Sequence, residues 1–177
     1  MPLWVFERVI WEIERTTGNT QDDWKLYGGY LHLLAILGKM NAEKVEKAAG
    51  LLKLSKFQSD FLVLDKDKDG MNIPKTFLPI LYKLAEGTFW ESEISTEALD
   101  KYRQRYLENE LNQRSAIFMK LVIALSKKDF SPKLSERKIQ QELEEPKALP
   151  PELSRQSFAV EVIPYEDLWE MLTAEPN

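Results

Sequence analysis

Apolar residues recur at helical spacing along most of this chain, and this period limits the folds open to it. Between residues 96 and 128 apolar residues recur mostly three, four or seven positions apart, at Leu99, Tyr102, Tyr106, Leu111, Phe118, Leu121 and Leu125. That spacing is typical of one face of an α-helix, whereas the alternation typical of strands is confined to residues 158–163. The sequence therefore predicts an all-α, bundle-like domain of five to six helices.

Capping residues and glycines divide the pattern into separate helices. A helix is expected to begin where a side chain accepts from first-turn amides, and to end at glycine. The expected N-caps are Asn19, Thr20 or Asp22, then Asn41, Thr76, and Ser95 or Thr96, and the expected stops are Gly18, Gly38 and Gly87. Further helices are expected over residues 2–17 and 55–64. The longest helix runs from Ser95 to near Lys128, either breaking near Asn112 or forming the spine of the fold.

The composition changes near residue 130. Residues 1–134 hold 20 lysines and arginines against 19 aspartates and glutamates, and residues 135–177 hold 4 against 10. The whole acidic excess of this chain of net charge −5 therefore lies in its final quarter. We expect a helical domain over residues 1–130 and an acidic extension over 131–177. The extension is predicted to hold a weak helix (135–145), a proline-rich linker (146–153), a strand-like segment (158–163) and an amphipathic helix (164–172).

The last of these segments carries the leading candidate for a contact surface. Its apolar residues follow the i, i+3, i+4, i+7 pattern with which amphipathic helices present anchors to a partner, at Tyr165, Leu168, Trp169 and Leu172. Tryptophan and tyrosine are enriched among interface hot spots. The helix either binds another protein or folds back onto its own domain. Trp4 and Trp11 pose a similar choice between the core and a protein contact.

An acidic stretch offers the one local pattern with a defined metal chemistry. Carboxylates on alternate residues are followed by a glycine, at Asp65, Asp67, Asp69 and Gly70. This spacing resembles the first half of an EF-hand calcium loop, and the resemblance implies calcium ligands at the three aspartates. The second half departs from the family, with Asn72 at the usual apolar position and Thr76 in place of the bidentate glutamate. Pro79 would also lie deep inside the exiting helix. The alternative is a solvated turn.

Basic and aromatic residues interleave over residues 101–106, which suggests contact with nucleic-acid phosphates. The candidate phosphate ligands are Arg103, Arg105 and Arg114. Acidic residues are mixed among them, at Glu97, Asp100, Glu108 and Glu110. Such mixing is typical of a solvated helix face joined by ion pairs, and this is the alternative interpretation.

Residue usage limits the chemistry that we expect. A chain with no cysteine and one histidine, His32, lacks the donors of His/Cys zinc sites and of disulfides. No glycine-rich phosphate loop occurs. We therefore expect no enzyme and no cofactor other than the candidate calcium ion, and a structural role for His32. Charged residues interrupt the N-terminal apolar run, so we expect no signal peptide. Residues 31–37 form too short an apolar run to span a membrane, so we expect no membrane partner and a cytoplasmic location.

These observations favour a non-enzymatic protein-interaction or scaffold subunit of a larger assembly, which acts through apolar helical surfaces. One alternative is a helical accessory subunit of a nucleoprotein complex that contacts phosphates. The other is a degenerate EF-hand-like calcium-binding module.

Overall fold

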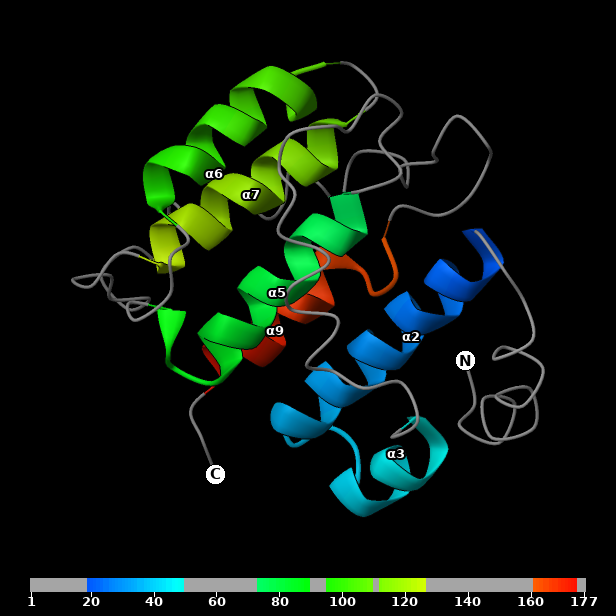
Figure 1. Cartoon of the computed structure of the whole chain (residues 1–177). Coiled ribbons are helices and arrows are strands. Elements are labelled where there is room, and N and C mark those ends of the chain that lie inside the picture. Colours follow the sequence, from blue (N-terminus) through cyan, green and yellow to red (C-terminus); the bar gives the residue numbers. More distant parts are fainter. Residues whose placement is uncertain (1–18, 50–72, 90–94, 110–111, 127–160, 175–177) are drawn as a thin grey trace.

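The computed structural model describes residues 19–49, 73–89, 95–109, 112–126 and 161–174 (Figure 1). These residues form six α-helices and one π-helical turn, with no strand among them. The elements are α2 (Asn19–Ile36), α3 (Ala42–Ala49), α5 (Ile73–Ala85), α6 (Thr96–Tyr102), η2 (Arg103–Leu107), α7 (Gln113–Leu125) and α9 (Tyr165–Thr173). The predicted all-α fold is therefore confirmed for this part of the chain.

Several predictions fall outside these residues. The expected helices over 2–17 and 55–64, with Trp4 and Trp11, lie there, as do Asp65, Asp67 and Asp69. The weak helix and the proline-rich linker also lie outside. Of the strand-like segment, residues 161–163 are described and are not in a strand.

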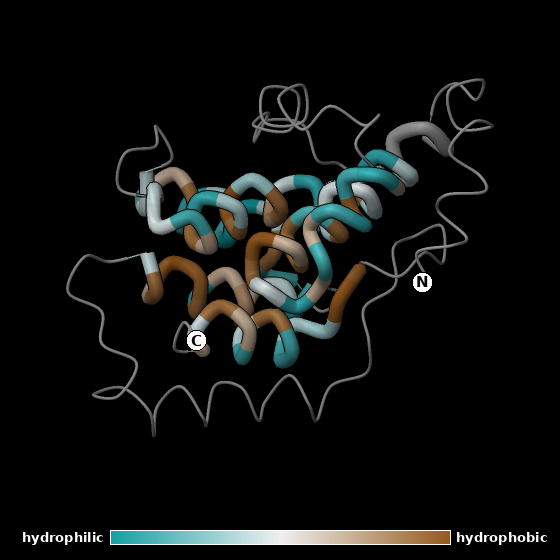
Figure 2. Tube along the Cα trace, turned by 90° about the horizontal axis from the view of Figure 1, so that it is seen from below, coloured by the Kyte–Doolittle hydropathy of each residue, from teal (hydrophilic) through white to brown (hydrophobic). Residues whose placement is uncertain are grey.

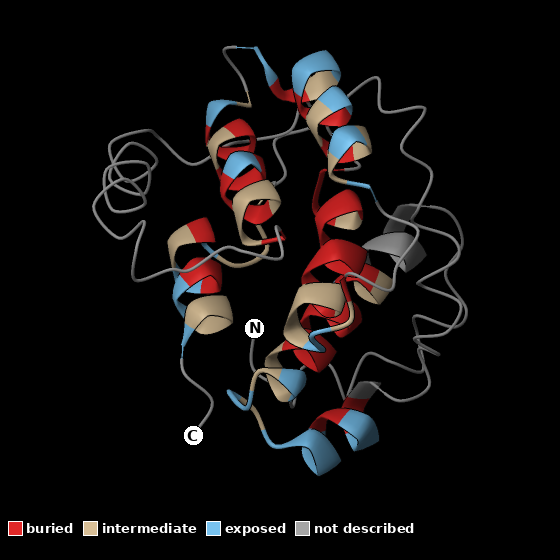
Figure 3. Ribbon diagram, turned by 90° about the vertical axis from the view of Figure 1, so that its left-hand side faces the viewer, coloured by how far each residue is buried: buried red, intermediate tan, exposed pale blue. Residues whose placement is uncertain are grey.

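Each described helix packs against at least one other, and α9 lies close to α5. Helix α3 packs on α2, α2 packs on α5, and α6 with η2 packs on α7 (Figure 1). Along α6, α7 and α9 buried and exposed residues alternate every few positions, whereas α5 holds no exposed residue (Figure 3). Hydropathy alternates in the same way along each helix (Figure 2). This banding is what the helical spacing of apolar residues predicts.

One hydrophobic core joins most of these helices. Its fully buried large side chains include Leu33 of α2, Phe77 and Leu81 of α5, Leu99 of α6, Leu107 of η2, and Phe118 and Met119 of α7. Helix α9 contributes three more members: Tyr165, Leu168 and Trp169. Residues 161–174, assigned to an extension from the sequence, therefore share the core of residues 73–126. The division at residue 130 stays a prediction, because residues 127–160 are not described.

Local capping explains where several helices begin and end. The Ser95 side chain accepts from the Ala98 amide at 3.0 Å and caps α6, and the Asn41 side chain accepts from the Lys44 amide at 3.0 Å. Gly38 and Gly87 follow α2 and α5 with φ of +69° and +68°. Apart from the adjacent residues, no atom lies within 4 Å of the place where a Cβ would stand on either glycine, so backbone conformation, not crowding, favours glycine there. These predicted caps and stops are confirmed.

The long helix expected from Ser95 is interrupted, as the first of its two alternatives predicted. After α6 the backbone widens into the π-helical turn η2, and α7 begins after Asn112. The side-chain amides of Asn109 and Asn112 both donate to the Tyr106 carbonyl, at 2.9 and 3.2 Å. That carbonyl thereby keeps hydrogen-bond partners where the helix is broken.

Helix α5 corrects the prediction that Thr76 caps a helix. The helix begins at Ile73, and Thr76 is buried within it, with its hydroxyl 3.4 Å from that of Tyr102. Pro79 lies in the middle of α5. An interior proline costs about 3 kcal/mol or more because it lacks an N–H. Burial of an apolar side chain contributes about 1.5–3 kcal/mol, and α5 buries five of them: Ile73, Phe77, Leu78, Ile80 and Leu81.

Two tyrosine hydroxyls fasten α5 to α2. Tyr82 donates to the Gly29 carbonyl at 2.7 Å, and Tyr30 donates to the Pro74 carbonyl at 3.3 Å. Burial raises the pKa of both hydroxyls, and Glu86 raises that of Tyr82 further. A single helix runs through Gly28 and Gly29, and both residues are buried. The helix therefore continues through the glycine pair without a break.

Candidate functional site

Three aromatic rings hold α9 against α5 and α7. The Tyr165 ring stacks on Phe118 with centroids 4.4 Å apart and planes 10° apart. Both rings tilt against Phe77, at 5.6 Å from Tyr165 and 5.1 Å from Phe118. Such pairs stabilise by about 0.5–1.5 kcal/mol beyond the area that they bury. We call Phe77, Arg114, Ser115 and Phe118 together the α9-binding surface.

The hydroxyl of Tyr165 also has a specific partner. It lies 2.7 Å from the hydroxyl of Ser115, a residue of α7 that is fully buried. A buried phenol requires a hydrogen-bond partner to offset its desolvation. The ring and the hydroxyl of Tyr165 therefore both match the α9-binding surface.

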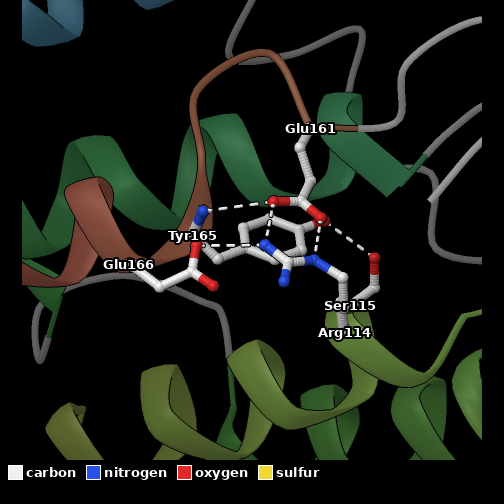
Figure 4. A network of polar contacts seen from close by, with 5 residues as sticks. All are labelled: Arg114, Ser115, Glu161, Tyr165 and Glu166. Atoms are coloured by element: carbon white, nitrogen blue, oxygen red, sulfur yellow. Dashed lines mark hydrogen bonds and ion pairs between the residues drawn. The ribbon is translucent and has the colours of Figure 1, made fainter. Parts of the chain in front are cut away.

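A buried ionic cluster joins Arg114 of α7 to Glu161, which precedes α9, and to Glu166 of α9 (Figure 4). Arg114 donates through Nε to Oε1 of Glu161, and through Nη2 to Oε2 of Glu161 at 2.8 Å and to Oε2 of Glu166 at 3.0 Å. The three side chains are 7%, 8% and 14% exposed. The hydrogen bonds that Arg114 donates to Glu161 raise the pKa of Arg114; burial opposes this shift, and the hydrogen bond to Glu166 adds to it. Arg114 is therefore a fixed cation that binds two carboxylates, one of them through both oxygens.

One of these carboxylates also orders the start of α9. Oε2 of Glu161 accepts from the Tyr165 backbone amide at 3.3 Å, whereas the N-cap residue Pro164 supplies no side-chain bond. Glu166 and Asp167 lie in the first turn, where negative charge interacts favourably with the helix dipole. The acidic residues thus stabilise the helix and bind it to Arg114.

The predicted contact residues of α9 lie inward. Tyr165, Leu168 and Trp169 are buried in the core, and Leu172 packs partly buried against it. Asp167 and Glu170 are exposed. The described structure therefore has the second of the two alternatives, in which the amphipathic helix packs on its own domain. Whether these residues also contact another protein stays a prediction.

The three candidate phosphate-binding arginines do not form one surface. The side chain of Arg114 forms ion pairs with Glu161 and Glu166, as described above. Arg103 donates to Asp100 at 2.9 Å and also to Glu108, and these hydrogen bonds raise its pKa despite its burial. Arg105 is exposed and lies over the Tyr106 ring, 5.3 Å from its centroid. With two cations paired internally, this geometry does not favour the nucleic-acid alternative.

The remaining candidates contribute little to this site. His32 is buried, and its Nε2 has no hydrogen-bond partner. No cluster of three or more metal-ligating side chains occurs among the residues that the structure describes. The calcium hypothesis stays a prediction, since Asp65, Asp67 and Asp69 lie outside them. None of the described helices is both long and apolar enough to cross a bilayer.

Sequence reasoning missed Ser115, Glu161 and Glu166 as members of the cluster. One signal was present, because Arg114 and Ser115 precede Phe118 by four and three residues and share its helix face. A cation on an apolar face requires a buried anion. The sequence does not reveal that the anions follow 47 and 52 residues later.

Comparison of the chain with protein-family models, with curated proteins and with solved structures gave no match.

Proposed function

We propose that this chain is a non-enzymatic protein-interaction subunit that holds an amphipathic helix on the α9-binding surface. The observation that carries the proposal is the match between α9 and this surface. Apolar, hydroxyl and ionic contacts all converge there, at Phe77 and Phe118, at Ser115, and at Arg114. Amphipathic helices recognise partners through anchors spaced in this way.

Polar side chains elsewhere in the domain hold helices together, and this supports a role as a scaffold. The hydroxyls of Tyr30 and Tyr82 join α5 to α2, and the side chain of Arg103 joins α6 to the end of η2. Ser126, the C-cap residue of α7, donates to the Ile123 carbonyl at 2.9 Å. These groups fix helices in place, which is the use expected of polar residues in a structural domain. A cytoplasmic location is part of the proposal and agrees with the lack of cysteine.

A peptide of residues 161–174 tests the proposal on the full-length chain. Tyr165→Ala and Trp169→Ala in the chain remove the anchors of its own helix and leave the α9-binding surface intact. We expect saturable binding of the fluorescent peptide, measured by anisotropy. Binding should weaken by at least about tenfold when the chain also carries Arg114→Glu, which corresponds to about 1.4 kcal/mol.

A matched control replaces Arg103 by Glu in the same chain, because Arg103 pairs with local carboxylates and lies off the surface. This control should bind the peptide as the parent variant does. We call the chain with Tyr165→Ala and Trp169→Ala the vacated chain. If it keeps its helical circular dichroism but binds no peptide, the proposed function is contradicted.

A further inference from the structure

The two halves of the site come from separate stretches of the chain. The α9-binding surface lies within residues 73–126, and its ligand is residues 161–174. The 34 residues numbered 127–160 connect them in sequence. A chain of that length spans up to about 110 Å when fully extended, so the connection does not dictate which copy supplies the helix.

The contacts at the site would be the same between two copies as within one. The cluster joins one cation of α7 to Glu161 and Glu166, and the stack joins Phe118 to Tyr165. Exchange of an identical element requires no new contact, which makes it an accessible route to a dimer. The contacts between the α9-binding surface and residues 161–174 therefore do not depend on the two belonging to the same chain.

Charge is unevenly distributed along the chain. Residues 1–134 carry one more positive than negative group, whereas residues 135–177 carry six more negative than positive groups. Two copies of net charge −5 repel each other overall, so the local pairing of Arg114 with Glu161 and Glu166 must supply the electrostatic attraction at each exchanged site.

We propose that residues 161–174 also dock on the α9-binding surface of a second copy, so that two chains exchange this helix and form a dimer with two equivalent sites. This inference rests on the proposed function and names its partner. The monomer competes, because the chain's own helix is present at a high effective concentration. The exchanged dimer is therefore expected to increase with protein concentration.

Complementary charge reversal tests the exchange with full-length chains. One variant carries Arg114→Glu, and the other carries Glu161→Arg with Glu166→Arg. Alone, each variant brings like charges together both within a chain and between copies. In an equal mixture, each surface meets an oppositely charged segment only on the other variant. We expect native mass spectrometry to show a heterodimer, at twice the 20.7 kDa of one chain, in at least tenfold excess over either homodimer.

A matched control mixes Arg103→Glu with the Glu161→Arg, Glu166→Arg variant and should give no such excess, because Arg103 contacts neither glutamate. If either reversed chain loses its helical circular dichroism, unlabelled and ¹⁵N-labelled wild-type chains provide the second measurement. A dimer of intermediate mass that increases with concentration supports exchange.

Wild-type chains that stay monomeric at all concentrations would overturn the exchange. So would folded charge variants that form no heterodimer. If the exchange fails in either way but the vacated chain binds the peptide, the proposed function still holds. If the vacated chain does not bind the peptide, both the proposed function and the exchange are contradicted.

Discussion

Arg103 and Arg114 each bind two carboxylates, but in opposite surroundings. The partners of Arg103 are three and five residues away, and their side chains are 44% and 51% exposed. The partners of Arg114 are 47 and 52 residues away, and their side chains are only 8% and 14% exposed. One cluster therefore reinforces a turn that is already local, and the other joins two distant segments.

The difference shows that the number of ion pairs is a poor measure of their importance. Exposed pairs contribute about 0–1 kcal/mol, because water and salt screen the charges. In a buried cluster, the loss of one partner leaves the other charges without compensation. The Arg114 cluster should therefore control whether α9 stays docked, whereas the Arg103 cluster should have little influence on the fold.

The largest effect is expected from Arg114→Met, which keeps the volume of the side chain and removes its charge. Glu161 and Glu166 would then be buried without a cation, so the free energy of unfolding should fall by about 3–5 kcal/mol. Urea denaturation followed by circular dichroism measures this. A loss below 1 kcal/mol would mean that the buried cluster is no more important than an exposed one.

High pH extends the comparison to neutral contacts, because it removes the protons of the buried tyrosine hydroxyls and leaves the charge of Arg114 unchanged. Because the pKa values of Tyr30 and Tyr82 are raised in the folded chain, their contribution to stability is complete below the ordinary tyrosine pKa of about 10. Above that pH the unfolded chain loses these protons first, so stability should decrease by about 1 kcal/mol per tyrosine between about pH 10 and 11. Arg114 stays charged, since its pKa is raised.

Urea melts at several alkaline pH values measure this decrease. A chain with Tyr30→Phe and Tyr82→Phe should show a flatter dependence on pH. An equal slope in the two proteins would assign the alkaline loss to other groups.

The smallest effect is expected from Arg103→Met. Asp100 and Glu108 are half exposed and regain water, so the free energy of unfolding should fall by about 1 kcal/mol or less. The loss should shrink further at high salt, which screens exposed charges. A loss as large as that of Arg114→Met would remove the contrast between the two clusters.

Features set by neighbouring residues were predicted well from the sequence. The caps at Asn41 and Ser95 and the stop at Gly38 depend on the residue itself and on the adjacent turn. The inward faces of the helices follow from the same local period: Val45 and Ala48, three residues apart in α3, are both buried. The amphipathic stripe of α9 was also recognised.

Features that depend on distant packing were not predicted. A helix was expected to begin at Thr76, which would place Pro79 in its first turn, but α5 begins at Ile73 and holds Pro79 in its interior, with apolar residues buried on several sides. The π-helical turn at Arg103–Leu107 had no signal in the spacing of apolar residues. For Tyr165 and Trp169 the spacing indicated anchors and left open what they contact, since the Phe118 and Arg114 contacts come from another part of the chain.

The brevity of α9 has a consequence for how residues 161–174 come to be ordered. With nine residues, it is shorter than the roughly 12–15 at which isolated helices become even marginally stable in water. The segment therefore forms its helix only as it docks, and the conformational entropy lost on helix formation weakens the docking. A detached copy of this segment should be largely unstructured, and its ellipticity at 222 nm would report each attachment as it happens.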